Sequence, residues 1–341
     1  MDQRKASAVE IFRRYGRRTE YGAGVVSMMQ NPVLARLEGA QNVLIAGAGG
    51  GFDVYAGLPL AFALEAQGKT VRLANLSFSD LGDDELWVAP GVAAVHADSP
   101  GSDEYFPERT LARWFASRGS PRIIHAFVPS GVASLRVAYQ WLATTYNLDA
   151  IVVVDGGTDM LLTGDESGLG TPIEDMTTLA AVNGLAAFRT RLAVSIGFGI
   201  DAYHGVNHTE VLENISTLTR DGAYLGAFSV PPDSDEATTY LDAVEHAARA
   251  TPGRVSIVNG QIAASLRGRA DIDGASRRTE GSALFVNALM NIYFAFDLDG
   301  LARSVHYLDT ISDTATRGQV AEAIEAYRYD VPPRRPRPFP H

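Results

Sequence analysis

Short apolar runs that end in glycine and a carboxylate recur along the chain. Residues 42–46, 150–154 and 192–196 are largely apolar, and each leads into a glycine-containing loop that carries an aspartate. Short apolar runs bounded by glycine are typical of strands buried on both faces. In an open parallel sheet, ligands bind beyond the carboxyl ends of the strands. The pattern therefore predicts one acidic, glycine-lined cleft at that edge.

Stretches of helical period alternate with these runs. Further strands are expected at residues 70–76, 92–96 and 123–128, and helices at 33–37, 60–67, 108–118, 132–146, 173–188 and 209–219. Strands alternating with helices of this length indicate parallel strands joined by right-handed crossovers. We expect an α/β fold, a three-layer sandwich with a mainly parallel, Rossmann-like sheet.

The pattern becomes less regular after residue 226. It predicts a helix at 235–250, a strand at 256–259, an apolar stretch at 283–296, a helix from Asp299 and a last helix at 316–327. With no Pro- or Ser-rich linker, we predict a helical lead-in over 1–40 and a single α/β domain over 41–330. The Pro/Arg-rich tail 331–341 is typical of extended polyproline.

Composition narrows the classes of function. The 341 residues carry a net charge of −11, which disfavours binding to nucleic acid or anionic membranes. The absence of cysteine excludes disulfides, thiolate nucleophiles and Cys-ligated metals. The chain shows neither a secretory signal nor a membrane span. We expect a cytoplasmic protein with a small-molecule substrate and no nucleic-acid or membrane partner, and homo-oligomerisation stays open.

The first glycine loop resembles the opening of a dinucleotide fingerprint without completing it. Phe52 stands where a third glycine is required, and Asn75 where an acidic residue would bind the ribose. The loop is interpreted either as a tight turn, with Asp53 accepting from local amides, or as a place where a ligand approaches the backbone. The ligand-binding candidates are Gly47, Gly49, Gly50, Gly51, Asp53 and Asn75.

The second loop concentrates carboxylates. Asp155 and Asp159 are followed by Asp165 and Glu166, and Gly156-Gly157 leaves the backbone bare between the first two. Clustered carboxylates repel each other, so they indicate a bound cation, a hydroxylated ligand or an acid–base role. Asp155 and Asp159 are predicted catalytic residues and candidate ligands of Mg²⁺ or Ca²⁺, and Gly156 and Gly157 candidate binding positions.

Other polar residues near strand ends are assigned separately. In the third loop, Asn207 is expected to cap the helix that begins at Thr209, so that helix starts between His204 and His208. The two histidines then lack helical spacing, which disfavours a metal shared between them. His204 alone is predicted to transfer a proton. Ser130 could bind an anion at a helix start. Glu174 is expected to close a capping box with Thr171.

The Ala46–Asp53 and Asp155–Asp159 turns, with the segment 294–298, resemble an uncharacterised prokaryotic family, domain of unknown function 1152. The resemblance implies no reaction. The acidic strand ends are also similar to those of nucleoside hydrolases, but their N-terminal Asp-x-Asp-x-x-x-Asp-Asp cluster is missing here.

The leading hypothesis is a hydrolytic or lytic enzyme acting on a sugar- or nucleoside-like metabolite. Asp159, Asp155 and His204 would do the chemistry, with Asp53 assisting. The alternative is a nucleotide-using transferase or nucleotide-binding module whose Gly47–Gly51 loop holds phosphate. A third reading is an assembly component whose loops are only structural.

Overall fold

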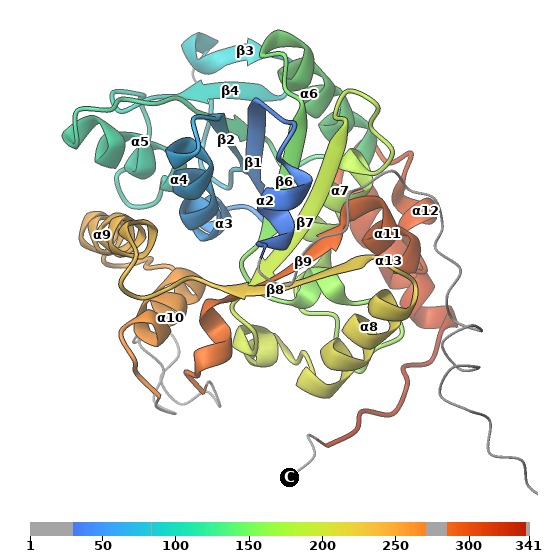
Figure 1. Cartoon of the computed structure of the whole chain (residues 1–341). Coiled ribbons are helices and arrows are strands. Elements are labelled where there is room, and N and C mark those ends of the chain that lie inside the picture. The colour runs from blue at the N-terminus through green and yellow to red at the C-terminus, as the bar shows by residue number, and fades with distance from the viewer. Residues whose placement is uncertain (1–29, 83, 271–284, 339–341) are drawn as a thin grey trace, which may run out of the picture. The chain divides into compact units, whose positions relative to one another are not determined.

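A nine-stranded sheet forms the centre of the protein (Figure 1). The computed structural model describes residues 30–82, 84–270 and 285–338, and residues from Asn31 onward form one compact unit. The strand order is β3-β4-β5-β2-β1-β6-β7-β9-β8. The strands are β1 (Asn42–Gly47), β2 (Thr70–Leu76), β3 (Trp87–Ala89), β4 (Val92–Val95), β5 (Ile124–Phe127), β6 (Ala150–Asp155), β7 (Thr190–Ile196), β8 (Tyr224–Ser229) and β9 (Ile292–Asp297).

The middle of the sheet is parallel and its margins are antiparallel. Strands β5, β2, β1, β6 and β7 pair in parallel, whereas β3–β4, β4–β5, β7–β9 and β8–β9 pair antiparallel. Both faces of the central strands are buried: Ile151 and Val153 of β6 belong to one core, and Val152 and Val154 to the other. Burial on both faces explains the continuous apolar runs in the sequence.

Helices cover both faces of the sheet and confirm the predicted α/β architecture. The core on one face includes residues of α2 (Pro32–Arg36), α3 (Asp53–Ala56), α4 (Leu58–Ala66), α5 (Pro107–Ser117), α9 (Asp235–Ala250) and α10 (Ile257–Leu266). The other core includes residues of α6 (Val132–Thr145), α7 (Pro172–Val182), α8 (His208–Arg220), α11 (Leu298–Ser304), α12 (Leu308–Ile311) and α13 (Arg317–Asp330).

The direction of the winding reverses between β1 and β6. The chain passes from β1 to β2 on one side, and β6 returns to the other side of β1. The helices after these two strands, α3 and α7, enter opposite layers. Such a reversal leaves space for a ligand beyond the strand ends, because the two connections diverge.

Several local predictions are wrong. Residues 256–259 start helix α10 rather than a strand, with Ser256 Oγ accepting from Asn259 N at 3.1 Å. Asp53 is the first residue of α3 rather than part of a loop. Helix α7 ends at Val182, six residues before the predicted end. The edge strand β8 was not predicted, because Gly226 interrupts its pattern with a bulge.

The structure describes most of the C-terminal tail but little of the N-terminal segment. Most of the predicted N-terminal lead-in lies outside the described residues. Residues 332–338 form neither helix nor strand, and Arg334 N donates to Asp165 O at 2.7 Å, so this tail is attached to the second loop. Within residues 30–82, 84–270 and 285–338, no helix has the length and apolar character to span a membrane.

Candidate active site

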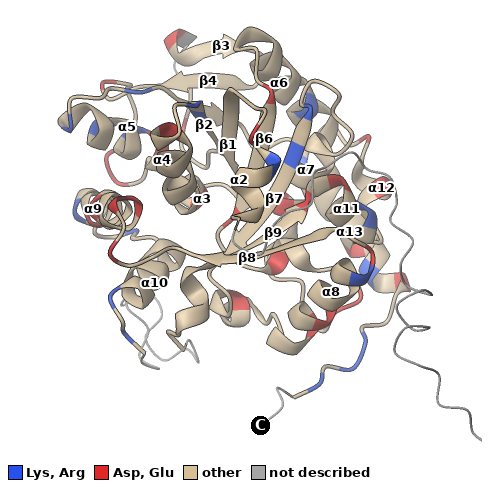
Figure 2. Cartoon of the chain, in the orientation of Figure 1, with Lys and Arg blue, Asp and Glu red and all other residues tan. Residues whose placement is uncertain are grey.

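Five aspartates gather beyond the carboxyl ends of β1, β6 and β7. Each comes from a segment next to the reversal of the sheet, and four of them are buried while Asp53 is partly buried. Asp155 is the only carboxylate within the five parallel strands. Acidic residues otherwise lie mainly on loops and on helices such as α9 (Figure 2). The group, called the acidic site below, consists of Asp53 at the start of α3, Asp155 at the end of β6, Asp159, Asp175 in the first turn of α7, and Asp201 after β7.

Hydroxyl side chains orient three of these carboxylates. In each case the donor bonds to Oδ2, and within the described residues no hydrogen bond reaches Oδ1. Ser195 Oγ donates to Asp155 at 3.0 Å, Thr171 donates to Asp159 from N (2.8 Å) and Oγ1 (2.9 Å), and Thr158 Oγ1 donates to Asp201 at 3.2 Å. One oxygen of each carboxylate is therefore held while the other is available to a ligand.

Glycines stand where the carboxylates approach the backbone. A Cβ atom on Gly49 would lie 2.8 Å from Asp53 Oδ2 and 2.9 Å from Asp175 Oδ1. One on Gly157 would lie 2.7 Å from Asp201 Oδ2. At Gly49 and Gly157, which were predicted to let a ligand approach the backbone, the missing side chain leaves room for carboxylates of the protein itself.

Burial and mutual repulsion disfavour ionisation of the acidic site. Burial raises the pKa of Asp53 to about 7, with the charge of Asp159 adding to the effect. Burial, then repulsion from neighbouring aspartates, raises the pKa values of Asp155 and Asp175 well above the ordinary range. No Lys or Arg forms an ion pair with any of the five carboxylates in the part of the chain that the structure describes.

His204 is the basic side chain that acts on this group. Burial raises the pKa of Asp159, and the hydrogen bonds from Thr171 and the charge of His204 oppose that rise. His204 ends the 3-10 turn Ile200–His204 and is exposed, whereas Asp159 is buried. The charge of His204 thus favours the ionised form of Asp159, although no hydrogen bond or ion pair joins the two side chains among the described residues.

A family model described as "Protein of unknown function (DUF1152)" matches residues 92–329. The chain belongs to this family. The matched residues include four members of the acidic site, whereas Asp53 and the Gly47–Gly51 loop precede them. No curated protein and no solved structure matches the chain.

The Gly47–Gly51 loop of this DUF1152 protein uses its amides internally. Ala48 N donates to Val154 O at 2.8 Å, Gly49 N to Asp53 Oδ2 at 2.7 Å, and Gly51 N to Leu76 O at 3.0 Å. Gly50 and Gly51 have φ values of 86° and 61°, which require glycine. These three amides therefore donate to Asp53 and to the neighbouring strands β6 and β2, and the bond to Asp53 is the one that the tight-turn interpretation expects.

The side chain of Asn75 holds the Gly47–Gly51 loop in place through a hydrogen bond to the loop backbone. Its Nδ2 donates to Gly51 O at 2.7 Å and to Glu108 Oε1 at 2.7 Å, and Ser77 Oγ donates to Glu108 Oε2 at 3.0 Å. A Cβ atom on Gly47 would lie 2.3 Å from Asn75 Oδ1, so Gly47 makes room for this side chain. Asn75 is fully buried, which makes it a support for the loop.

Two predictions for polar residues at helix starts, the Thr171–Glu174 capping box and the anion site at Ser130, are wrong. Thr171 does not cap α7 with its side chain but bonds to Asp159, and Glu174 pairs with Arg317. The start of α6, where Ser130 was expected to bind an anion, is filled by backbone: Gly131 N and Ala133 N donate to Ala315 O and Thr314 O. Asn207 caps α8 as predicted, accepting from Thr209 N at 2.9 Å.

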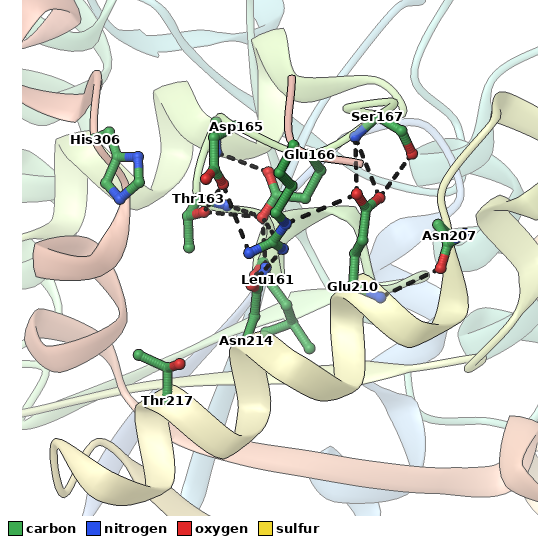
Figure 3. A network of polar contacts seen from close by, with 12 residues as sticks. Leu161, Thr163, Asp165, Glu166, Ser167, Asn207, Glu210, Asn214, Thr217 and His306 are labelled. Carbon is green, nitrogen blue, oxygen red and sulfur yellow. Dashed lines mark hydrogen bonds and ion pairs between the residues drawn. The ribbon is translucent and has the colours of Figure 1, made fainter. Parts of the chain in front are cut away.

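A second acidic group lies in the loop 163–170 (Figure 3). Glu166 is fully buried and accepts from Thr163 N, Gly164 N and Asn214 Nδ2, and Arg334 Nη2 lies 3.1 Å from its Oε1. Although burial acts to raise it, these hydrogen bonds hold the pKa of Glu166 below its usual value. Asp165 and Glu166 are thus separate from the acidic site.

Sequence reasoning missed Asp175 and Glu108. Asp175 follows Glu174 and resembles an ordinary acidic residue in the first turn of a helix. The sequence feature that could have identified Asp175 is its helical spacing. It lies one helical turn before Leu179, which is fully buried, so both residues occupy the inner face of α7. Glu108 carries no comparable signal, because its partners are Asn75 of β2 and Ser77 just after that strand, both more than 30 residues away.

Proposed function

We propose that this protein is an enzyme that cleaves a small, hydroxyl-bearing metabolite of the sugar or nucleoside class, by hydrolysis or elimination, at the acidic site. The observation that carries the proposal is the convergence of five carboxylates at the reversal of the sheet, without a Lys or Arg ion pair among the described residues. Buried carboxylates that lack basic partners are costly, so they indicate a ligand that balances them.

The orientation of the carboxylates favours hydroxyl recognition. The Oδ2 atoms of Asp155, Asp159 and Asp201 accept bonds from the protein. Their Oδ1 atoms can accept from substrate hydroxyls, since a carboxyl oxygen that carries no proton is an acceptor in both the neutral and the ionised form. The hydroxyl groups of a sugar ring are donors that suit such a group of acceptors.

Asp159 and His204 provide a route for protons. In hydrolysis, water loses a proton to the base as its oxygen bonds to the electrophilic carbon, and the leaving group departs with a proton from the acid. We assign the exposed His204 to take the proton from water and then to give it to the leaving group, and the buried Asp159 to orient the reacting group.

The nucleotide alternative has less support. Phosphate binding by a glycine loop needs free backbone N–H groups. Three amides of the Gly47–Gly51 loop already donate to Val154, Asp53 and Leu76, and Asp53 would oppose a phosphate.

The test is a cleavage screen over nucleosides, nucleotides, glycosides and sugar phosphates with product detection by mass spectrometry. The Asp159→Asn variant keeps an acceptor for Thr171 and should retain its fold, but it should lower turnover about 100-fold or more. Asp98→Asn, an exposed aspartate, is the matched control and should retain full activity. Cleavage of no compound by the wild type, or equal turnover by the Asp159 variant, would contradict the proposal.

A further inference from the structure

Three members of the acidic site are close enough to share one ion. Asp53, Asp155 and Asp175 each offer an oxygen, and these atoms lie within 4.8 Å of one another. Because Mg–O and Ca–O distances are about 2.0–2.6 Å, oxygens bound to one cation lie within about 5 Å of each other. The spacing therefore matches the inner ligands of a single cation.

Asp175 gives an independent indication that something is bound. It is 3% exposed, and its Oδ1 atom is buried and has no hydrogen-bond partner among the residues that the structure describes. This oxygen faces the Gly49 backbone beside Asp53 Oδ2, where a side chain on residue 49 would fill the space. A buried carboxylate oxygen without a donor is rare in native proteins, and a cation would satisfy it.

Hydrogen bonds near Asp53, Asp155 and Asp175, called the trio below, fix these residues without using the oxygens that would face a cation. Thr178 Oγ1, one turn after Asp175, donates to Ala48 O at 2.8 Å and ties α7 to the end of β1. Ser195 holds Asp155 by Oδ2 alone. These contacts come from the sheet and from the helix layer that contains α7, so the oxygens are positioned before any ligand arrives.

The donor set selects the class of ion. All three ligands are carboxylate oxygens, the preference of Mg²⁺, Mn²⁺ and Ca²⁺. Zinc favours His nitrogen and Cys sulfur, and the chain has no cysteine.

We propose that Asp53, Asp155 and Asp175 together bind one hard divalent cation of the Mg²⁺, Mn²⁺ or Ca²⁺ class. This deepens the proposed function, since the ion would occupy the same site and could polarise a bound substrate oxygen. It differs from the sequence-based pairing of Asp155 with Asp159, because Asp159 is held by Thr171 and lies outside the trio.

The experiment is calorimetric titration of the full chain, treated with EDTA and dialysed, with MgCl₂, MnCl₂ and CaCl₂ separately. We expect one site for at least one of these ions, binding about tenfold or more weakly in Asp175→Asn and in Asp155→Asn, which still accepts from Ser195. Asp98→Asn should bind as the wild type does. Ion-dependent thermal stabilisation should likewise disappear in the two site variants.

Failure of this inference is distinct from failure of the proposed function. Absence of stoichiometric binding to the folded wild type, or equal affinity in the wild type and both site variants, would overturn the cation site. Turnover by a folded wild type that binds none of the three ions would overturn the cation site while supporting an enzyme. Specific cation binding supports the cation site even when no compound of the cleavage screen is consumed.

Discussion

At the scale of single residues, the carboxylates of the acidic site restrict which side chains fit next to them. Gly49 illustrates this, because the space next to its Cα is taken by oxygens of Asp53 and Asp175. Its φ lies outside the left-handed region, so the backbone itself would tolerate a side chain. The requirement for glycine at this position is therefore one of space.

Substituting Gly49→Ala should disrupt the acidic site. The added methyl would displace both carboxylates and lengthen the 2.7 Å bond from Gly49 N to Asp53. We expect a loss of about 1–3 kcal/mol in unfolding free energy, measured by urea denaturation, together with weakened cation binding. Gly39→Ala, at an exposed position with no atom within 4 Å, is the control and should change stability by less than about 0.5 kcal/mol. Equal effects of the two substitutions would show that crowding at residue 49 is unimportant.

At the scale of elements, the C-terminal tail holds the loop that leads into α7. Arg334 of the tail donates to Asn214 Oδ1 at 2.8 Å and pairs with buried Glu166. Arg328, in the last turn of α13 before the tail, donates to Glu166 O at 2.8 Å. Ser167 N, in the same loop, donates to Glu210. The loop continues to Thr171, which orients Asp159, so the tail is connected to the acidic site through a short stretch of chain.

Arg334→Ala should therefore loosen residues 163–171 more than the rest of the protein. Removing the guanidinium leaves Glu166 buried without its cationic partner, which we expect to cost about 2 kcal/mol because Arg334 is itself partly exposed. Hydrogen exchange should increase at Thr163, Gly164 and Thr171 while β6 stays protected. Arg335→Ala, on an exposed neighbour, should change neither exchange nor stability. If the exchange of residues 163–171 is the same in both variants, the tail does not hold the loop.

At the scale of the whole molecule, buried acids make global stability depend on pH. Glu108 lies outside the acidic site and joins α5 to β2. Burial, the largest cause, raises the pKa of Glu108 from its usual 4.5 to about 7, although Asn75 and Ser77 donate hydrogen bonds to the carboxylate. The folded protein thus binds this proton more tightly than the unfolded chain does. The stabilising contribution is complete below pH 4.5 and is lost as the pH rises through about 7.

The Glu108→Gln variant tests this sign. Glutamine keeps an acceptor for Asn75 and cannot ionise, so the variant should gain stability relative to the wild type between pH 5 and pH 8. The gain should reach at most about 3 kcal/mol, from 1.36 kcal/mol per pKa unit. Urea denaturation at both pH values measures it, with exposed Glu104→Gln as the control. A wild-type-to-Glu108→Gln difference that does not change with pH would show that Glu108 ionises normally.

How far the sequence predicts the structure depends on the range of the interactions involved. Strand β2 and helix α9 have the predicted bounds, because apolar period and helix-capping residues act within a few positions. The segment 256–259 was misassigned because a short apolar run has no distinguishing period, and Ser256 as a cap decides for the helix. The Thr171–Glu174 capping box failed because Asp159, twelve residues earlier, accepts from Thr171 instead.

The sequence by itself determined the alternation of buried strands and helices, the absence of thiol chemistry, and the glycine–aspartate loops after β1, β6 and β7. These depend on local period and composition. Only the tertiary structure decided which carboxylates meet: it placed Asp175 of α7 beside Asp53 and Asp155, and separated Glu166 into a group held by the tail. The physical reason is that strand order and helix docking create these neighbours through contacts between distant residues, and no period along the chain encodes them.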